Sequence, residues 1–296
     1  MTRAGNAAGT FPSGGAPQGP SAPALAGRPF WKMTGSGNDF VFFDNRTGAH
    51  DALADPRVIG ALCDRRGGIG ADGIVLIDRH PRFAFGMRYY NRDGSLAEMC
   101  GNAALCSASL ARELDIAGPG DFTFDTPSGP VTARIAGDTP EIDMVPVTEL
   151  APTIDTPRLP GERRIGYCRV GVPHLVVEVD DLGAIDVVTR GRALRHLAQL
   201  RDGANVNFVA RDAASGRWQM RTYERGVEDE TLACGTGTVA TVALLNAWGA
   251  IDGGIPLLTG SGCDLYARAG ARPALRGEGR IVCSGTLRDV HPTPTP

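Results

Sequence analysis

Short runs of hydrophobic residues, separated by polar turns, recur along most of the chain and predict a protein rich in β-strands. The strand candidates, by their β-branched and aromatic content, are FVFFD (40–44), IVLID (74–78), FGMRYY (85–90), HLVVEVD (174–180), VNFVA (206–210) and WQMRTY (218–223). Two longer stretches, ALCSASLAREL (104–114) and TVATVALLNAW (238–248), have helical spacing and end near Gly118 and Gly249. Because both are apolar nearly all round, each is expected to be a helix buried within its own domain.

The same order of segments occurs twice, which indicates an internal duplication. MRYYNRDGSLAEMCGN (87–102) is similar to MRTYERGVEDETLACGT (220–236), so that Asn91 falls opposite Glu224 and Cys100 opposite Cys234. Upstream, NDFVFFD (38–44) is similar to HLVVEVD (174–180), and ADGIVLI (71–77) is similar to ANVNFVA (204–210). Two similar domains that face each other would place equivalent residues on opposite walls of one cleft.

The duplication also divides the chain. We expect residues 30–149 to form an N-terminal half and residues 150–279 a C-terminal half, with the Pro-rich stretch 145–162 as connector. A last strand at 280–291 could return to the N-terminal half. Residues 1–29 are rich in Ala, Gly, Pro and Ser and are expected to be a disordered extension, and 292–296 a frayed end.

Composition narrows the class of protein. The chain has 296 residues, of which 42% are hydrophobic and 21% are charged, and its net charge is −3. This balance does not provide the excess of positive charge that binding to nucleic acid or to an anionic membrane requires. No apolar run reaches the roughly 18 residues of a transmembrane helix, and no signal-peptide core follows the first residues. Seven scattered cysteines, an odd number, suggest a reducing cytoplasm.

Cys100 and Cys234 each precede a glycine at the start of a predicted helix. Free N–H groups and the helix dipole at such a position favour negative charge, so a thiol loses its proton more readily and a substrate carboxylate can bind. Two thiols on opposite walls suit inversion of a carbon centre next to a carboxylate, because one thiolate can remove a proton from one face while the other thiol delivers one to the opposite face. The cysteines expected to be ordinary core residues are Cys63, Cys168, Cys263 and Cys283.

Other chemistries fit the sequence less well. It has no CxxC, HxxxH or HExxH pattern, so we expect no metal. Pyridoxal phosphate needs a Schiff-base lysine, and the only lysine, Lys32, lies beside the predicted disordered arm. GIGADG (68–73) matches GxGxxG, but a helix-like segment precedes it and a strand-like segment follows, the reverse of a dinucleotide site. We therefore expect an enzyme that uses no cofactor.

Six segments together resemble the diaminopimelate epimerase family. In the family's order they are KMTGSGNDFVFFDNR (32–46), GGIGADGIVLI (67–77), YNRDGSLAEMCGN (90–102), GVPH (171–174), ANVNF (204–208) and YERGVEDETLACGTGT (223–238). The resemblance implies an α/β (α+β) fold of two pseudo-symmetric domains, each a mostly antiparallel, barrel-like sheet around a central helix, usually in a homodimer. It also implies interconversion of LL- and meso-2,6-diaminopimelate in lysine and peptidoglycan precursor synthesis, in the cytoplasm.

Carried over to this sequence, the resemblance assigns a role to each candidate residue. The two bases would be Cys100 and Cys234. The residues that would assist the thiols are His174 and Glu224. Those that would hold the distal amino-acid head of the substrate are Asn38, Asn91, Asn205 and Arg225. Those that would hold the reacting carboxylate are Gly101, Asn102, Gly235 and Thr236. Taken singly, each polar residue also fits a structural role, and it is their occurrence together that favours function.

The sequence departs from the family pattern at several positions. Val172 stands where the family often has asparagine, Gly73 where some members have glutamine, and Ala103 and Leu105 where it usually has glycine and arginine. These changes leave the two-thiol chemistry intact and bear on the distal head. The alternative function is therefore a related two-cysteine racemase or isomerase that acts on another amino acid or small carboxylic acid. A non-catalytic binding protein on the same scaffold is a further alternative, against which the retention of both cysteines argues.

Overall fold

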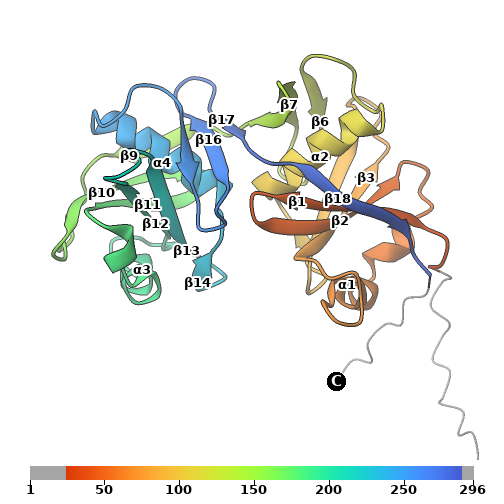
Figure 1. Cartoon of the computed structure of the whole chain (residues 1–296), viewed down its shortest axis with the longest axis horizontal. Coiled ribbons are helices and arrows are strands. Elements are labelled where there is room, and N and C mark those ends of the chain that lie inside the picture. Colours follow the sequence, from red (N-terminus) through yellow and green to blue (C-terminus); the bar gives the residue numbers. More distant parts are fainter. Residues whose placement is uncertain (1–24, 289–296) are drawn as a thin grey trace, which may run out of the picture.

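The computed structural model describes residues 25–288, which form two sheet-rich lobes side by side (Figure 1). The first lobe contains, in chain order, β1 (Pro29–Gly35), β2 (Asn38–Asn45), the 3-10 helix η1 (Asp51–Ala54), α1 (Pro56–Cys63), β3 (Gly73–Asp78), β4 (Gly86–Asn91), β5 (Leu96–Ala97), α2 (Gly101–Glu113), β6 (Phe122–Phe124), β7 (Val131–Ala136) and β8 (Thr139–Asp143). The second lobe contains β9 (Val147–Ala151), β10 (Glu162–Val170), β11 (Val172–Val179), the 3-10 helix η2 (Leu182–Ala184), α3 (Val187–Arg195), β12 (Asn205–Arg211), β13 (Trp218–Glu224), β14 (Asp229–Thr231), α4 (Gly235–Ala247), β15 (Ile255–Leu258), β16 (Asp264–Arg268) and β17 (Ala274–Arg276). The last strand, β18 (Arg280–Thr286), lies back in the first lobe on β1.

The two lobes repeat one arrangement of strands. In the first lobe β1 and β2 are antiparallel, β2 and β3 are parallel, and β3 and β4 are antiparallel. In the second lobe β10, β11, β12 and β13 pair in the same three senses. A parallel pair needs a crossover connection, and α1 and α3 supply it in equivalent places. The duplication inferred from the sequence is thus visible in the topology.

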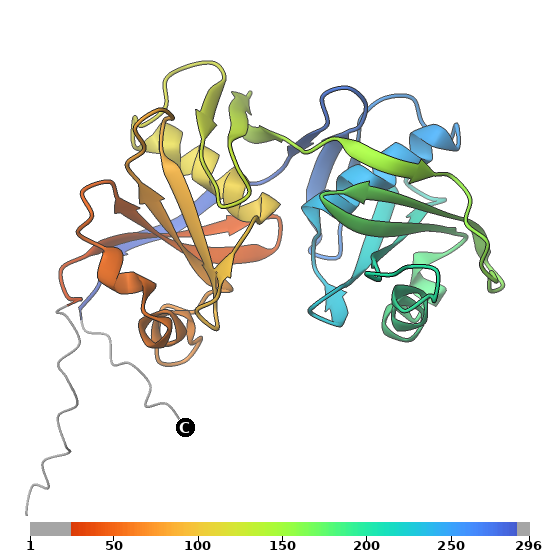
Figure 2. The ribbon, with the colours of Figure 1, turned by 180° about the vertical axis from the view of Figure 1, so that it is seen from behind.

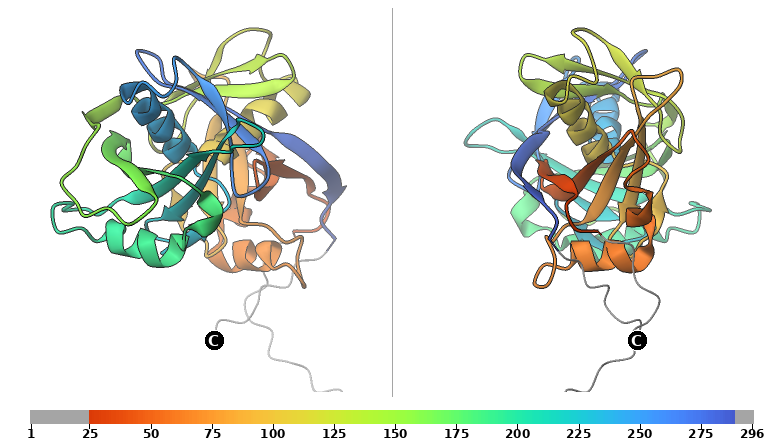
Figure 3. Two further views of the ribbon diagram at one scale, coloured as in Figure 1. Left: turned by 60° about the vertical axis from the view of Figure 1, so that its left-hand side comes forward. Right: turned by 90° about the vertical axis from the view of Figure 1, so that its right-hand side faces the viewer.

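Strand pairing also joins the lobes. A six-stranded sheet has the order β18-β1-β2-β3-β4-β5, and a second sheet runs β6-β7-β8-β17-β16-β15-β13-β12-β11-β10-β9 with β14 on β13. The link within this second sheet is the pairing of β8 with β17. The chain crosses between lobes from β8 to β9 and from β17 to β18, as Figure 2 shows from behind. Figure 3 shows α1 and α3 at the same end of the molecule.

Three predicted boundaries differ from the structure. The predicted disordered extension, 1–29, reaches into the described residues, where Leu25 is buried in one cluster with Leu287 and the Gly27 N–H donates to the Leu287 carbonyl (2.8 Å). The burial of Leu25 against Leu287 is the physical reason why this part of the predicted extension is ordered. The stretch 145–162 contains a strand, β9, which pairs with β10 and therefore extends a sheet. The last strand ends at Thr286, before the predicted 291. Residues 1–24 and 289–296, with the predicted frayed end, lie outside the described residues.

The two predicted helices are α2 and α4. Helix α4 is followed by Gly249 at φ 67°, the left-handed position that glycine favours after a helix. Helix α2 ends earlier than expected, at Glu113. The left-handed conformation that terminates it is taken by Asp115 (φ 53°) and not by Gly118. No helix within residues 25–288 is long and apolar enough to span a membrane.

Both helices are buried inside their own lobes, as predicted. Most of α2 from Asn102 to Ala111 and most of α4 from Gly237 to Leu245 is inaccessible to solvent. Helix α2 packs on β1, β7 and β8, and α4 packs on β10, β11 and β16. At Gly166 of β10 a Cβ would lie 2.6 Å from Leu244 Cδ2, which shows how closely helix and sheet approach. The first residues of both helices are thereby held in a fixed place.

Removal of one side chain in this helix–sheet contact should measure its contribution to stability. We expect Leu244→Ala to lower the free energy of unfolding by about 2–5 kcal/mol, because it removes buried methyl groups and leaves a cavity. The matched control is Leu159→Ala at a side chain that is 50% exposed, which should change it by less than about 0.5 kcal/mol. Urea denaturation followed by circular dichroism provides the measurement. Equal midpoints for the two variants would contradict the packing described.

Candidate active site

The N-termini of α2 and α4 meet in the middle of the molecule. Gly101 and Gly235 are the first residues of the two helices, and a Cβ on either would lie 3.8 Å from the Cα of the other. The Leu275 side chain of β17 fills the space beside both, since its Cδ2 would lie 3.1 Å from a Cβ on Gly101 and 2.7 Å from one on Gly235. Glycine at both positions therefore permits the two helix ends to approach backbone to backbone.

Cys100 and Cys234 are the N-cap residues of these helices, with nearly the same backbone conformation: φ −139° and ψ 115° for Cys100, φ −136° and ψ 107° for Cys234. Each cysteine directly precedes one of these two glycines. The structure thus brings the two predicted thiols together from opposite lobes at a pair of facing helix N-termini.

Burial and the helix ends act on these thiols in opposite directions. Burial raises the pKa of the Cys100 thiol to about 11 and that of Cys234 to about 12. The N–H groups of Ala103 and Asn102 lower the pKa of Cys100 in part, and the Thr236 hydroxyl, 3.6 Å from the sulfur, lowers that of Cys234. Both thiols are consequently protonated at neutral pH in the unliganded protein.

A hydrogen-bonded chain links the first lobe's polar candidates. The Asn102 amide donates to Asn38 Oδ1 (2.7 Å), and the Asn38 amide donates to Asp72 Oδ2 (3.0 Å). The Arg65 guanidinium holds the other oxygen of Asp72 (2.9 Å). Asn102 Oδ1 is buried and has no partner within residues 25–288, so it remains available to a ligand. The sequence prediction missed Asp72, although the duplicated segments align it with Asn205.

The second lobe contributes a matching cluster. His174 and Asn205 are neighbours in the parallel register of β11 and β12. Asn205 Oδ1 accepts from the Arg225 backbone N–H (2.8 Å), and the Arg225 guanidinium donates to the Asp202 carbonyl (3.2 Å). Glu224 is the last residue of β13, and burial raises the pKa of its carboxyl group. Its charge in turn raises the pKa of both catalytic-candidate thiols, which places it near them.

His174 is completely buried in this cluster. Burial, and to a lesser degree the Arg225 cation, lower its pKa to about 3, so the imidazole is neutral. Its Nε2 has no partner among the described residues.

Asn91 differs from the other predicted residues. Its amide donates to Ser95 Oγ (3.0 Å) within its own hairpin turn, and within residues 25–288 no hydrogen bond joins it to another candidate.

The strand neighbour of Asn91 is Gly73, where a Cβ would lie 2.2 Å from the Tyr90 carbonyl oxygen. The Tyr89 ring occupies the same space, with its hydroxyl 3.1 Å from that Cβ position, so no side chain fits at residue 73. Burial, and after it the charge of a Cys100 thiolate, raise the pKa of Tyr89, which places this ring near Cys100; the sequence prediction did not include it.

The remaining departures lie in different surroundings. Ala103 and Leu105 are completely buried in α2. Val172 is partly buried at the start of β11, paired with Val170. Lys32 belongs to β1, and its Nζ forms an ion pair with Asp39 (2.7 Å).

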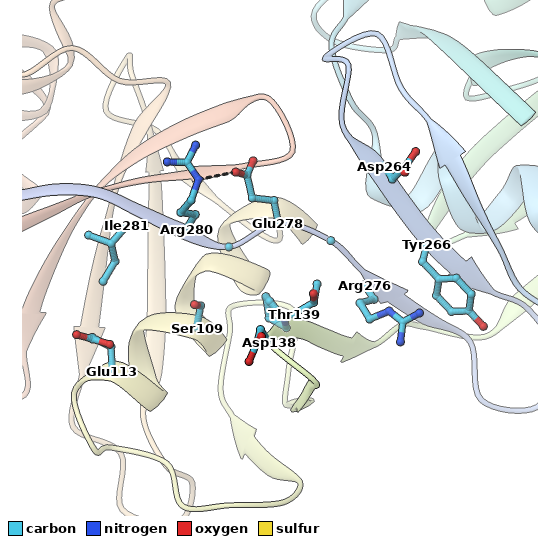
Figure 4. Close-up of a pocket in the computed structure, with 13 residues that line it drawn as sticks. Ser109, Glu113, Asp138, Thr139, Asp264, Tyr266, Arg276, Glu278, Arg280 and Ile281 are labelled. Carbon is cyan, nitrogen blue, oxygen red and sulfur yellow. Dashed lines mark hydrogen bonds and ion pairs between the residues drawn. The ribbon is translucent and has the colours of Figure 1, made fainter. Parts of the chain in front are cut away.

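A groove of about 810 Å³ lies away from the thiols, along the crossover from β17 to β18 (Figure 4). It is lined by Ser109, Glu113, Asp138, Thr139, Pro140, Asp264, Tyr266, Arg276, Gly277, Glu278, Gly279, Arg280 and Ile281. The charged groups there are largely engaged with their neighbours: Arg280 donates to Glu278 (2.8 Å), and Arg276 stacks over Tyr266 (4.3 Å). None of the predicted site residues lines this groove. Within residues 25–288 no group of three His, Cys, Asp or Glu side chains is arranged to hold a metal ion.

Known proteins resemble this chain in sequence and in fold. The family model described as diaminopimelate epimerase matches residues 30–149 and 166–262. A diaminopimelate epimerase from Gemmatimonas aurantiaca is 44% identical over 276 residues, covering 87% of this chain and 98% of the relative. One from Hydrogenobaculum is 40% identical over 221 residues, covering 71% and 79%. Among solved structures, the phenazine biosynthesis protein of the PhzF family from Bacillus anthracis has a TM-score of 0.66 at 12% identity, covering 88% of this chain and 98% of that one, which shows a shared fold.

Thiol alkylation should report these environments. With iodoacetamide at pH 7 we expect the exposed Cys283 to react first, Cys100 much more slowly and the more deeply buried Cys234 slowest. Because only the thiolate reacts and burial raises the pKa of Cys100 to about 11, its rate should climb about tenfold per pH unit above neutrality. Peptide mapping by mass spectrometry over time is the measurement. Labelling of Cys234 as fast as Cys283 in the folded protein would contradict the assigned burial.

Proposed function

The chain belongs to the diaminopimelate epimerase family, and we propose that it interconverts LL- and meso-2,6-diaminopimelate with Cys100 and Cys234 as opposed acid and base. The observation that carries the proposal is that Cys100 and Cys234 are the N-caps of two helices, one in each duplicated lobe, whose first residues lie close to each other. Such an enzyme is an isomerase in lysine and peptidoglycan precursor synthesis.

The facing helix ends suit the reacting carboxylate. The first N–H groups of α2 and α4, at Gly101–Asn102 and Gly235–Thr236, have no partners within their helices, and both dipoles present their positive ends. A carboxylate held there stabilises the negative charge that develops when the adjacent α-proton leaves.

The proton transfers balance without a cofactor. One thiolate takes the α-proton from one face of the carbon, and the electron pair moves into the carboxylate as an enolate. The opposite thiol then gives its proton to the other face, so the centre is inverted and the charges of the two sulfurs are exchanged. The reverse reaction starts with the roles of Cys100 and Cys234 exchanged.

One thiol must lose its proton before the first turnover. Glu224 is the proposed acceptor, because burial raises its pKa and its negative charge raises the pKa of both thiols. When the proton moves to Glu224 the site keeps a single negative charge, and the repulsion between carboxylate and thiolate disappears. The ammonium group of the bound substrate would stabilise the thiolate further.

Residues of the second lobe suit a substrate that carries a second amino-acid head, distant from the reacting carbon. Arg225 is held by Asn205 through its backbone and by the Asp202 carbonyl through its guanidinium, and it carries a positive charge suited to a distal carboxylate. Asn38 is oriented by Asp72. This arrangement favours diaminopimelate over a small acid with one head. From the family resemblance we propose further that the enzyme is a homodimer in the cytoplasm. None of the seven cysteines, all within residues 25–288, forms a disulfide, which is compatible with a reducing compartment.

Exchange of the α-proton in heavy water tests the chemistry directly. We expect deuterium to enter LL-diaminopimelate at the α-carbon, and Cys100→Ser and Cys234→Ser each to reduce inversion by about 10²–10⁴, because a serine hydroxyl is a far poorer base. The control is Cys283→Ser at an exposed cysteine away from the helix ends, which should keep full activity. Rates are measured by NMR.

A substrate analogue with a leaving group separates the two faces. Each serine variant keeps one thiol, so each should eliminate the leaving group only from the enantiomer whose α-proton points at that thiol. Opposite preferences in the two variants are expected. Full inversion by both variants, or loss of elimination from the same enantiomer in both, would exclude the two-base assignment. Exchange with other amino acids but not with diaminopimelate would favour the alternative racemase.

A further inference from the structure

Asn207 is a buried polar residue for which the mechanism above has no role. It lies on β12 two residues after Asn205 and is completely inaccessible to solvent. Its Nδ2 donates to the Leu175 carbonyl (3.0 Å) and lies 3.3 Å from His174 Nδ1, and its Oδ1 accepts from the Thr222 hydroxyl (3.0 Å). Every polar atom of this amide therefore has a partner.

The partners decide which way the amide faces. The Leu175 carbonyl can only accept a hydrogen bond, so it requires the NH₂ end of Asn207, and the Thr222 hydroxyl then donates to the oxygen end. The second hydrogen of the NH₂ group is the one available to His174 Nδ1. An Nδ1 that accepts a hydrogen bond carries no proton. The neutral ring of His174 must then carry its proton on Nε2.

That proton has no acceptor within residues 25–288. His174 Nε2 is buried and unpaired, although the ring is completely enclosed and a buried donor is costly to leave unsatisfied. An unsatisfied donor at a candidate active site is best explained by a ligand, or a reacting group, that accepts from it when the site is occupied.

A close contact couples Asn207 to the turn that carries Cys234. A Cβ on Gly237 would lie 2.3 Å from Asn207 Oδ1 and 3.1 Å from Cys234 Sγ. Glycine at residue 237 thus lets the amide pack directly against the first turn of α4. The amide lies between the imidazole of His174 and the thiol-bearing turn, where it keeps the ring in one orientation.

We propose that Asn207 is a positioning residue that holds His174 as the Nε2–H tautomer, so that this ring donates a hydrogen bond to an anion in the site. The anion is the thiolate or the substrate carboxylate of the proposed epimerase reaction. Only this identification of the anion rests on the proposed function; the tautomer of His174 does not. His174 would then stabilise negative charge and would not serve as a proton acceptor.

The tautomer can be read without activity. In protein labelled with ¹⁵N-histidine, two-bond proton–nitrogen NMR spectra distinguish a protonated from an unprotonated ring nitrogen. The chain has five histidines, so a His174→Gln spectrum identifies the His174 signals by their absence. We expect wild-type His174 to show an unprotonated Nδ1 and a protonated Nε2. A protonated Nδ1 in the wild-type protein would overturn the proposal, whatever any variant does.

Asn207→Leu tests the cause. It removes the NH₂ group that donates to His174 Nδ1 and keeps the size of the side chain, so the His174 ring protonated on Nδ1 should become populated, and kcat for α-proton exchange should fall about 10–100-fold, a usual cost of losing an orienting partner. Thr222→Ser, which keeps the hydroxyl that donates to Asn207, should retain the wild-type tautomer. An unchanged tautomer in folded Asn207→Leu would overturn the role of Asn207. The expected tautomer in a wild-type protein that exchanges no candidate substrate would support this inference and count against the proposed function.

Discussion

The close approach of two helix ends is the constraint on which the site depends. Gly101 and Gly235 lie so close that a Cβ on either would be 3.8 Å from the Cα of the other, and the Leu275 side chain closely approaches both. A methyl group at either position would meet the Leu275 side chain, which would have to move away from the two helix ends. The rest of the architecture serves this contact, since each helix is fixed in its own lobe by burial along most of its length.

The site balances low dielectric against oriented dipoles. Burial makes a thiolate costly and raises the pKa of both thiols, yet the same exclusion of water strengthens the attraction of the helix ends for an anion. The polar groups that would meet the substrate are held by second partners: Asn38 by Asp72, Arg225 by Asn205, and His174 by Asn207. Within residues 25–288, Asn102 Oδ1 and His174 Nε2 are buried atoms of this network without a hydrogen-bond partner, and both suit a bound substrate.

Local patterns were sufficient to predict the parts of the molecule that are local. The helices after Cys100 and Cys234 follow from apolar spacing, and the duplication follows from segments in register, so both thiols could be predicted. Asp72, Tyr89 and Asn207 could not, because their importance arises from contacts with residues of other strands: Tyr89 of β4 fills the space at Gly73 of β3, and Asn207 of β12 contacts His174 of the adjacent β11. The signal for Asn207 in the sequence was its position two residues after Asn205, which places both asparagines on the same face of β12. The pairing of β8 with β17 was equally hidden, since neither strand reveals its partner in its own sequence.

The return of β18 to β1 has a consequence for how the protein is made. Strand β1 begins at residue 29 and its partner begins at residue 280, so nearly the whole chain separates them. At about 5–20 residues per second of translation, β1 waits roughly ten seconds or longer for the strand that covers its edge. During that time the hydrogen-bonding groups of β1 form an open edge on the ribosome, the type of surface that invites pairing with another chain. The lobe that is synthesised first is thus the one completed last, and its nascent form is where a cell's chaperones would be needed.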